Sequence, residues 1–305
     1  MPSRWTGKEC MMEKKLLMIV NPRAGRNKSH GPLFDAAAIF SEAGYLLRIH
    51  RTTAPGDATE TVAREGSQYD LVVASGGDGT LNETIAGLVQ LDNPPLLGYL
   101  PQGSTNDFAS SLHISDDPAA AAEVIVQEHV QVLDVGLWNQ RPFAYVASFG
   151  AFTRTSYTAS QASKNALGHF AYILEGMKDL NSLRPYRIRV TADGEVLDGD
   201  YLFGAVCNST SIGGLMKLDP ERVVLDDGKF ELLLIPSPKT PLELQNLMLA
   251  LLNQHYDSEG LVFRHISSLH LETEEDLPWS LDGEYAPSTP SVDIVNRQGA
   301  LRILL

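Results

Sequence analysis

The stretch Ser75-Gly76-Gly77-Asp78-Gly79-Thr80-Leu81-Asn82-Glu83 decides the fold of this chain. It follows the apolar run 70–74, which predicts a buried strand, and it opens a helical pattern with apolar residues at 81, 85, 88 and 89. The glycines therefore lie where a strand ends and a helix begins, and they let backbone amides approach a ligand closely. Because a helix N-terminus attracts anions, we predict a phosphate-binding loop with Asp78 beside a Mg²⁺ ion or a water. An ordinary tight turn is the alternative, and Thr80 and Glu83 have the spacing of a capping box.

The first third of the chain alternates short apolar runs with helical patterns, which indicates an α/β fold with a parallel sheet between two helical layers. Ligands of such sheets bind at the carboxyl ends of the strands. The loops after Val20, Ala74 and Leu100 all lie at such ends, so we expect them to converge on one ligand. The predicted strands are 16–20, 45–50, 71–74 and 96–100, and the predicted helices are 33–43, 58–64, a helix from 81, and 119–127.

Strand-like segments dominate from Val130 onward, and only two helical patterns interrupt them. This arrangement predicts a second, antiparallel domain of the β-sandwich type, with the domain boundary near Gln131. The predicted strands are 131–137, 142–148, 186–192, 201–207, 229–235 and 265–272, and the predicted helices are 169–180 and 241–256.

Composition excludes several classes of protein. The apolar content of 43% and charged content of 20% are those of a globular protein, and no apolar run approaches the length of a membrane span. The net charge of −14 argues against a nucleic-acid binder, although the first 53 residues hold nine Lys or Arg against four Asp or Glu. Residues 1–12 carry no apolar signal core and are expected to be a frayed leader, with Met11 or Met12 as an alternative start. Two widely separated cysteines, Cys10 and Cys207, fit reduced thiols in the cytoplasm.

The run Gly76 to Glu83, GGDGTLNE, resembles the nucleotide-binding signature of the diacylglycerol-kinase catalytic superfamily, which includes bacterial soluble lipid kinases, sphingosine kinases and ceramide kinases. NAD kinases and phosphofructokinases share only its GGDG core. Further matches follow in the family's order and cover nearly the whole chain, and the set is most similar to the bacterial soluble lipid kinases. These matches are Asn21-Pro22-Arg23-Ala24-Gly25, Thr52 with Gly56-Asp57-Ala58, Pro101-Gln102-Gly103-Ser104-Thr105-Asn106-Asp107-Phe108, Leu225-Asp226-Asp227-Gly228 and Leu281-Asp282-Gly283-Glu284.

The resemblance implies a nucleotide-binding domain of residues 1–130, completed by a strand that returns from about 290–305, and a lipid-substrate domain of residues 131–289. It also implies ATP as the nucleotide. Thr52 could instead be an ordinary strand-end threonine, and Asn106 and Asp107 could instead cap a short helix. The implied nucleotide contacts are Asn21, Pro22, Arg23, Ala24, Gly25, Thr52, Gly76, Gly77, Asp78, Gly79, Thr80, Leu81, Asn82, Glu83 and Ser104.

The later motifs imply a catalytic base and a second metal site. By resemblance, Glu284 takes the proton of the lipid hydroxyl, with Asp282 as the competing carboxylate, and Asp78 is the second catalytic residue. A structural Mg²⁺ is implied at Asp227 with the carbonyls of Val224 and Lys229, where a plain Asp-Gly turn is the alternative.

Asp134 is implied to lie between the domains with Arg26 and Lys164 as basic partners, and a scattered set of surface charges is the alternative.

The sequence therefore predicts an Mg²⁺-dependent lipid kinase that transfers the γ-phosphoryl group of ATP to a lipid hydroxyl, first of all that of diacylglycerol. The alternatives are another lipid alcohol such as phosphatidylglycerol or a sphingoid base, an NAD kinase, and a non-catalytic nucleotide or lipid sensor. We expect a cytoplasmic protein that contacts the membrane surface, binds no nucleic acid, and is a monomer or a homodimer. The apolar helix 241–256 either packs on the sandwich or forms a wall of the lipid cleft.

Overall fold

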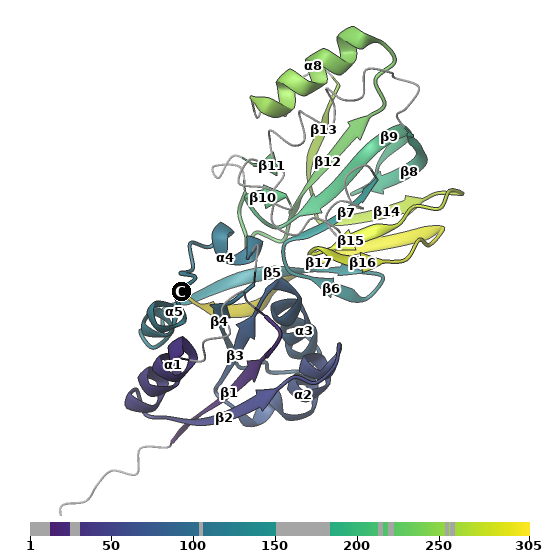
Figure 1. Ribbon diagram of the computed structural model, residues 1–305. Coiled ribbons are helices and arrows are strands. Elements are labelled where there is room, and N and C mark those ends of the chain that lie inside the picture. Colours follow the sequence, from purple (N-terminus) through teal and green to yellow (C-terminus); the bar gives the residue numbers. More distant parts are fainter. Residues whose placement is uncertain are drawn as a thin grey trace, which may run out of the picture.

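The computed structural model describes residues 13–24, 31–103, 106–150, 184–212, 216–218, 223–253, 256 and 260–305. Its strands form one large mixed sheet that runs through both halves of the molecule, and a two-stranded sheet lies beside it (Figure 1). The helix predicted at 169–180 lies outside the described residues. Within the described part of the chain, no helix has the length and apolar character needed to cross a bilayer.

The N-terminal half is a parallel sheet between two layers of helices, as predicted. The strand order is β2, β1, β3, β4, and every neighbouring pair is parallel. The elements are β1 (Lys14–Val20), α1 (Gly31–Glu42), β2 (Tyr45–Arg51), α2 (Asp57–Glu65), the short 3₁₀ helix η1 (Gly66–Gln68), β3 (Leu71–Gly76), α3 (Asp78–Leu88), β4 (Leu96–Pro101), α4 (Asp107–Ser111) and α5 (Pro118–Ile125).

Alternation along the strands explains the two layers of helices. Leu17 and Ile19 of β1 share a buried cluster with α2 and α3, whereas Leu16 and Met18 share another with α1 and α5. Successive side chains of a strand point to opposite faces, so a run that is apolar throughout must be covered on both sides. The two pairs of helices lie on opposite sides of the sheet in Figure 1.

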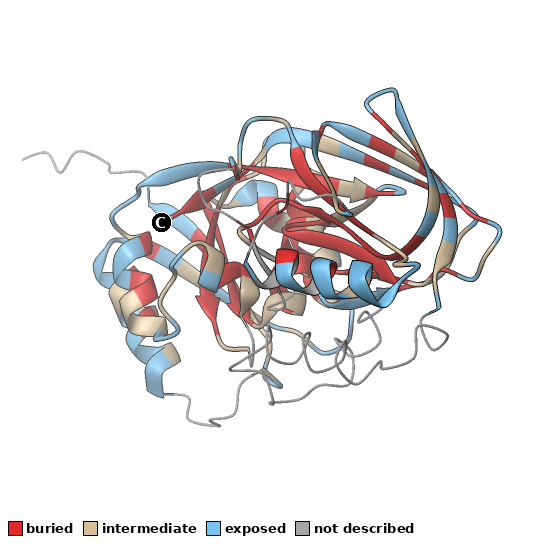
Figure 2. Ribbon diagram, turned by 90° about the horizontal axis from the view of Figure 1, so that it is seen from above, coloured by how far each residue is buried: buried red, intermediate tan, exposed pale blue. Residues whose placement is uncertain are grey.

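The C-terminal half is β-rich. Its strands are β5 (Val130–Trp138), β6 (Arg141–Phe143), β7 (Val146–Gly150), β8 (Tyr186–Ala192), β9 (Glu195–Cys207), β10 (Ser211–Ile212), β11 (Met216–Lys217), β12 (Phe230–Pro236), β13 (Val262–Ile266), β14 (Ser268–Glu272), β15 (Trp279–Leu281), β16 (Glu284–Ala286) and β17 (Ser291–Leu304), and its helix is α8 (Pro241–Leu252). The strands enclose a buried cluster that includes Trp279, Phe149 and Phe143. Buried stretches of the chain are drawn red in Figure 2.

Two single strands of the prediction are each divided in the structure. The segment 142–148 splits into β6 and β7 because Ala144 and Tyr145 direct their backbone N–H groups at the carboxylate of Asp282. The segment 265–272 splits into β13 and β14 because the N–H of Ser267 donates to Asp193. In both places a carboxylate replaces a neighbouring strand as the hydrogen-bond acceptor.

The last strand, β17, joins the two halves. Its first part pairs with β14 and β5, and Ile303 near its end lies opposite Leu97 of β4 in parallel register. A register shift between Arg297 and Leu301 separates these parts, as expected for a bulge that bends a strand. The start of α3, which follows β3, contacts the β-rich half, because the Asn82 amide donates to Asp282 at 2.7 Å.

Helix α8 lies at the far end of the β-rich half in Figure 1. Leu247 and Ala250 are buried, so one face of the helix packs on the sheet, whereas Leu242 and Leu249 are exposed. The helix predicted at 241–256 thus packs on the β-rich half and ends at Leu252, earlier than predicted.

Candidate active site

The glycine-rich stretch forms a tight connection between β3 and α3. β3 ends at Gly76, Gly77 is the N-cap in an extended conformation, and α3 begins at Asp78, earlier than the sequence predicted. A Cβ atom on Gly76 would lie 2.4 Å from Oγ1 of Thr80, so no larger residue fits there without a shift. A Cβ on Gly77 would lie 3.1 Å from Cα of Gly103 in the loop after β4. The loops after β3 and β4 therefore touch, as their common place at the sheet edge predicts.

The loop after β1 reaches the same place. The Asn21 side-chain amide donates to Oγ1 of Thr80 at 3.0 Å, and the Asn21 backbone N–H donates to the Ser75 carbonyl at 3.0 Å. Asn21 Oδ1 accepts from the N–H of Arg23 at 2.9 Å, which fixes the start of the loop with Arg23 exposed. Pro22 and Ala24 lie on this loop, whereas Gly25 and Ser104 lie outside the described residues.

Two further predicted contact residues have protein partners. Glu83 accepts hydrogen bonds from the backbone N–H groups of Gly56 at 2.9 Å and Ala58 at 3.3 Å, so it caps the neighbouring helix α2. The expected capping box with Thr80 is therefore absent: α3 has no side-chain cap, and its first residue is Asp78. Leu81 is buried in the core, and the N–H of Thr52 extends the β1–β2 pairing by donating to the Val20 carbonyl at 2.9 Å.

Three carboxylates gather around the start of α3. Asp78 lies at the helix N-terminus, its Oδ2 accepts from the N–H of Asp107 at 3.3 Å, and Asp282 contributes a third negative charge. Burial, and then the charge of Asp107, raise the pKa of Asp78 to about 7. Burial, and then the charge of Asp282, raise the pKa of Asp107 to about 6. Two neighbouring, partly buried acids with raised pKa values are typical of a site that binds a cation or moves a proton.

The sequence alone did not single out Asp107. Its neighbour Asn106 adopts a left-handed conformation with φ of 52°, and its Oδ1 accepts from the N–H of Gly103 at 2.8 Å. Asn106 therefore closes the loop on itself and does not cap α4, and Asp107 is left facing Asp78. The pairing of β3 with β4 could have indicated this contact, because it brings the loops that follow the two strands together.

The turn between β15 and β16 gives its two carboxylates opposite environments. Asp282 and Gly283 both have positive φ, at 49° and 83°, as a two-residue hairpin turn requires. Asp282 is buried and its oxygens accept from the N–H groups of Ala144, Tyr145 and Val146 and from the Asn82 amide. Glu284 is exposed, and a Cβ on Gly79 would lie 3.0 Å from its Oε1. The structure thus brings Glu284 to the glycine-rich loop.

The turn at Asp227 is exposed and contains two carboxylates, those of Asp226 and Asp227. Asp227 Oδ1 accepts from the N–H of Lys229 at 2.9 Å, and Gly228 has a φ of 78°. Val224 precedes the turn and is exposed. Across the described ranges of the chain, no group of three or more His, Cys, Asp or Glu is arranged to hold a metal ion. The predicted metal site at this turn stays a prediction.

Asp134 is buried, and each of its described hydrogen-bond partners is neutral. Its carboxylate accepts from the N–H of Gly228 at 2.7 Å, the N–H of Gly299 at 2.8 Å and the Asn296 amide at 3.1 Å. It therefore ties β5 to the Asp227 turn and to the bulge of β17. The basic partners expected for it, Arg26 and Lys164, lie outside the described residues.

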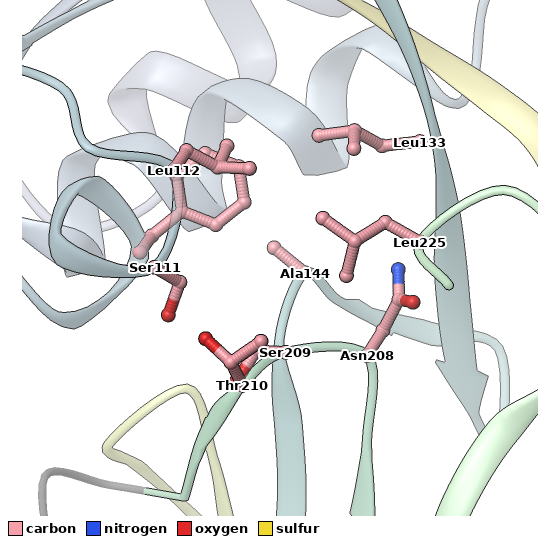
Figure 3. Close-up of a pocket in the computed structure, with 9 residues that line it drawn as sticks. Ser111, Leu112, Leu133, Ala144, Asn208, Ser209, Thr210 and Leu225 are labelled. Carbon is pink, nitrogen blue, oxygen red and sulfur yellow. The ribbon is translucent and has the colours of Figure 1, made fainter. Parts of the chain in front are cut away.

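A small pocket lies beside the carboxylates (Figure 3). Figure 3 shows Ser111 of α4 and Leu112, which follows that helix, on one side and Asn208 and Leu225 on the other. The lining is mostly apolar and consists of Phe108, Ser111, Leu112, Leu133, Ala144, Asn208, Ser209, Thr210 and Leu225. Two lining residues adjoin the acids, because Phe108 follows Asp107 and the N–H of Ala144 donates to Asp282.

The chain is similar to known kinases along nearly its whole length. Residues 15–138 match the diacylglycerol kinase catalytic domain, and residues 146–305 match the YegS C-terminal NAD kinase beta sandwich-like domain. A diacylglycerol kinase of Bacillus subtilis is 33% identical over 96% of both chains, and one of Staphylococcus aureus is 33% identical over 92% of this chain and 89% of its own. A crystal structure of a diacylglycerol kinase from Bacillus anthracis, 26% identical, covers 96% of both chains with a TM-score of 0.73. The chain belongs to the diacylglycerol kinase family of lipid kinases.

Proposed function

We propose that this protein transfers the γ-phosphoryl group of ATP to the primary hydroxyl of diacylglycerol, and that Glu284 is the general base. The observation that carries the proposal is the position of Glu284, an exposed carboxylate whose Oε1 lies beside Gly79 of the phosphate-binding loop. A carboxylate at that point can take the proton of a hydroxyl that attacks a bound phosphate. The relatives named above favour this lipid substrate over NAD.

The phosphates of ATP would bind to the backbone amides of the glycine-rich loop and to the N-terminus of α3. Kinases act mainly by positioning phosphates and stabilising charge, so a rigid amide cradle supplies much of what the reaction needs. Hydrogen bonds tie this cradle to the loops beside it: the Asn21 amide donates to Thr80, and the N–H of Gln102 donates to the Gly76 carbonyl.

Asp78 and Asp107 are the residues that would hold the magnesium ion. Oδ1 of Asp78 is buried without a hydrogen-bond partner, and a second carboxylate stands next to it. Two carboxylates suit Mg²⁺, which keeps several waters and binds substrate phosphates as well. Such an ion neutralises charge on the transferred phosphoryl group. A second, structural Mg²⁺ is proposed at Asp227 with the carbonyls of Val224 and Lys229.

The apolar pocket beside α4 would take part of the lipid's acyl region. Its walls come from both halves of the chain, and it lies next to the acids that position the phosphoryl group. A pocket lined mainly by carbon atoms excludes water from a bound chain but distinguishes similar chains weakly. We therefore propose tolerance for acyl length together with strict dependence on a free hydroxyl.

Peripheral contact with the membrane would follow from the basic N-terminal region, since nine of its first 53 residues are Lys or Arg. Binding to anionic vesicles should then weaken as salt rises, because exposed charges are screened beyond about 8 Å at physiological ionic strength. Salt-independent binding to such vesicles would contradict this part of the proposal.

Phosphate transfer from radiolabelled ATP to a panel of purified lipids in detergent micelles tests the proposed function. We expect a labelled product with diacylglycerol, and we expect its formation to depend on Mg²⁺. The variant Asp78→Asn should form no product, although its circular dichroism spectrum should match that of the wild type. Transfer to NAD, or to none of the lipids, would contradict the proposal.

In a parallel titration, Mg²⁺ should raise the melting temperature of Asp227→Ala less than that of the wild type if the second ion binds at that turn.

A further inference from the structure

The buried Asp282 carboxylate is held by four donors, none of which belongs to its own hairpin. The N–H groups of Ala144, Tyr145 and Val146 donate at 2.6, 3.0 and 2.9 Å, and the Asn82 side-chain amide donates at 2.7 Å. Each oxygen therefore receives two hydrogen bonds, which is enough to stabilise a carboxylate in a buried site. Such a carboxylate has no free oxygen with which to accept a substrate proton.

Asn82 is the donor that comes from the phosphate-binding helix. It lies one turn after Asp78 on α3, its side chain is buried, and its nitrogen is also 3.5 Å from the Pro142 carbonyl. Both partners are acceptors, so the amide nitrogen must face them. These contacts form a closed path. Gly79 and Asn82 both lie on α3, and the Asn82 amide binds Asp282. Asp282 precedes Glu284 by two residues, and the Glu284 carboxylate lies beside Gly79.

We propose that Asn82 and Asp282 are positioning residues that set the distance between Glu284 and the phosphate-binding loop. The proposal rests on the proposed role of Glu284 as the base. Three backbone donors alone would anchor the hairpin within the β-rich half. The hydrogen bond from Asn82 also fixes the hairpin relative to α3. It therefore aligns the carboxylate that accepts the proton with the loop that binds the phosphate. Misplacement of a reacting group by about 1 Å can lower a rate by about 100-fold.

A double-mutant cycle between Asn82 and Glu284 tests this inference. Asn82→Ala should lower kcat by about 10- to 100-fold while the dissociation constant of the nucleotide changes less than about threefold. In the Glu284→Gln background the same substitution should lower kcat by less than about twofold, because there is no longer a base to misplace. The matched control is Asn93→Ala, an exposed asparagine in the loop after α3, for which kcat should equal that of the wild type.

Hydrogen exchange and a second variant separate positioning from a loss of structure. In Asn82→Ala the amides of Ala144, Tyr145 and Val146 should stay protected, because they still bind Asp282. Asn82→Ser, whose hydroxyl is too short to span the gap, should show the same kcat pattern.

Equal losses of kcat from Asn82→Ala in both backgrounds would overturn the inference and leave Glu284 as the base. A near-normal kcat for Glu284→Gln alone would instead overturn the base assignment, and the inference with it.

Discussion

A Cβ atom built on Gly79 would lie 3.0 Å from Oε1 of Glu284, so the third glycine of the glycine-rich loop leaves the room that this carboxylate occupies. The two residues are far apart in the sequence and belong to different halves of the molecule. Their contact joins the loop that would bind the phosphates to the side chain that would take the proton.

Gly79→Ala should displace the Glu284 carboxylate without disturbing the fold. Gly79 has no positive φ that alanine would resist, and the atom in the way is the end of a flexible side chain. We expect kcat to fall about 10-fold or more, because the base is moved, with a melting temperature within a few degrees of the wild type. The matched control is Ala86→Ser, which also lies on α3. Gly194→Ala would not serve as a control, because alanine resists the φ of 90° that Gly194 adopts. Unchanged kinetics in Gly79→Ala would show that the contact has no bearing on the reaction.

Glu83→Ala should destabilise the protein through helix α2. The substitution removes the acceptor for the N–H groups of Gly56 and Ala58 and the negative charge at the start of that helix. Loss of such a cap costs about 0.5–2 kcal/mol, which urea unfolding can measure. Glu60→Ala, an exposed glutamate on the same helix turn, should change the free energy of unfolding by less than about 0.5 kcal/mol. Equal effects of the two substitutions would rule out the capping role.

Glu231 should make the stability of the protein depend on pH. It is buried on β12, its Oε2 has no hydrogen-bond partner, and burial raises its pKa to about 8. Between about pH 4.5 and pH 8 the folded protein keeps the proton that the unfolded chain has lost, so the free energy of unfolding falls as pH rises. The expected fall from this group is about 2–4 kcal/mol across that window.

Glu231→Gln should remove this part of the pH dependence and be more stable than the wild type at pH 8.5. Urea unfolding at several pH values measures the slope, and Glu274→Gln, at an exposed position, is the control. A slope that is the same in the wild type and in Glu231→Gln would mean that the buried carboxyl finds a partner when it ionises.

The sequence predicted those features of the site that depend on local patterns. The apolar run before Ser75 and the periodicity after Asp78 placed the glycines between a strand and a helix, and the order of strands brought three loops to one edge. It did not predict that Asp107 faces Asp78, because that contact depends on the left-handed turn at Asn106.

By resemblance alone the sequence assigned the base to Glu284, and it kept Asp282 as the competing carboxylate. Both are carboxylates beside one glycine in a turn, and either could accept a proton. The positive φ angles at Asp282 and Gly283 direct Asp282 inward to four donors and leave Glu284 exposed over Gly79. This difference in environment is visible only in the three-dimensional structure.

The kinetics of Glu284→Gln test the central claim most directly. Glutamine keeps the shape of the side chain but cannot accept a proton, and base catalysis typically contributes about 10²–10⁴-fold. Glu272→Gln, an exposed glutamate on β14, is the matched control and should keep the wild-type kcat. We predict that Glu284→Gln lowers kcat for diacylglycerol phosphorylation by a factor in that range while the nucleotide dissociation constant stays nearly unchanged. A kcat within about threefold of the wild type would contradict the assignment of Glu284 as the general base.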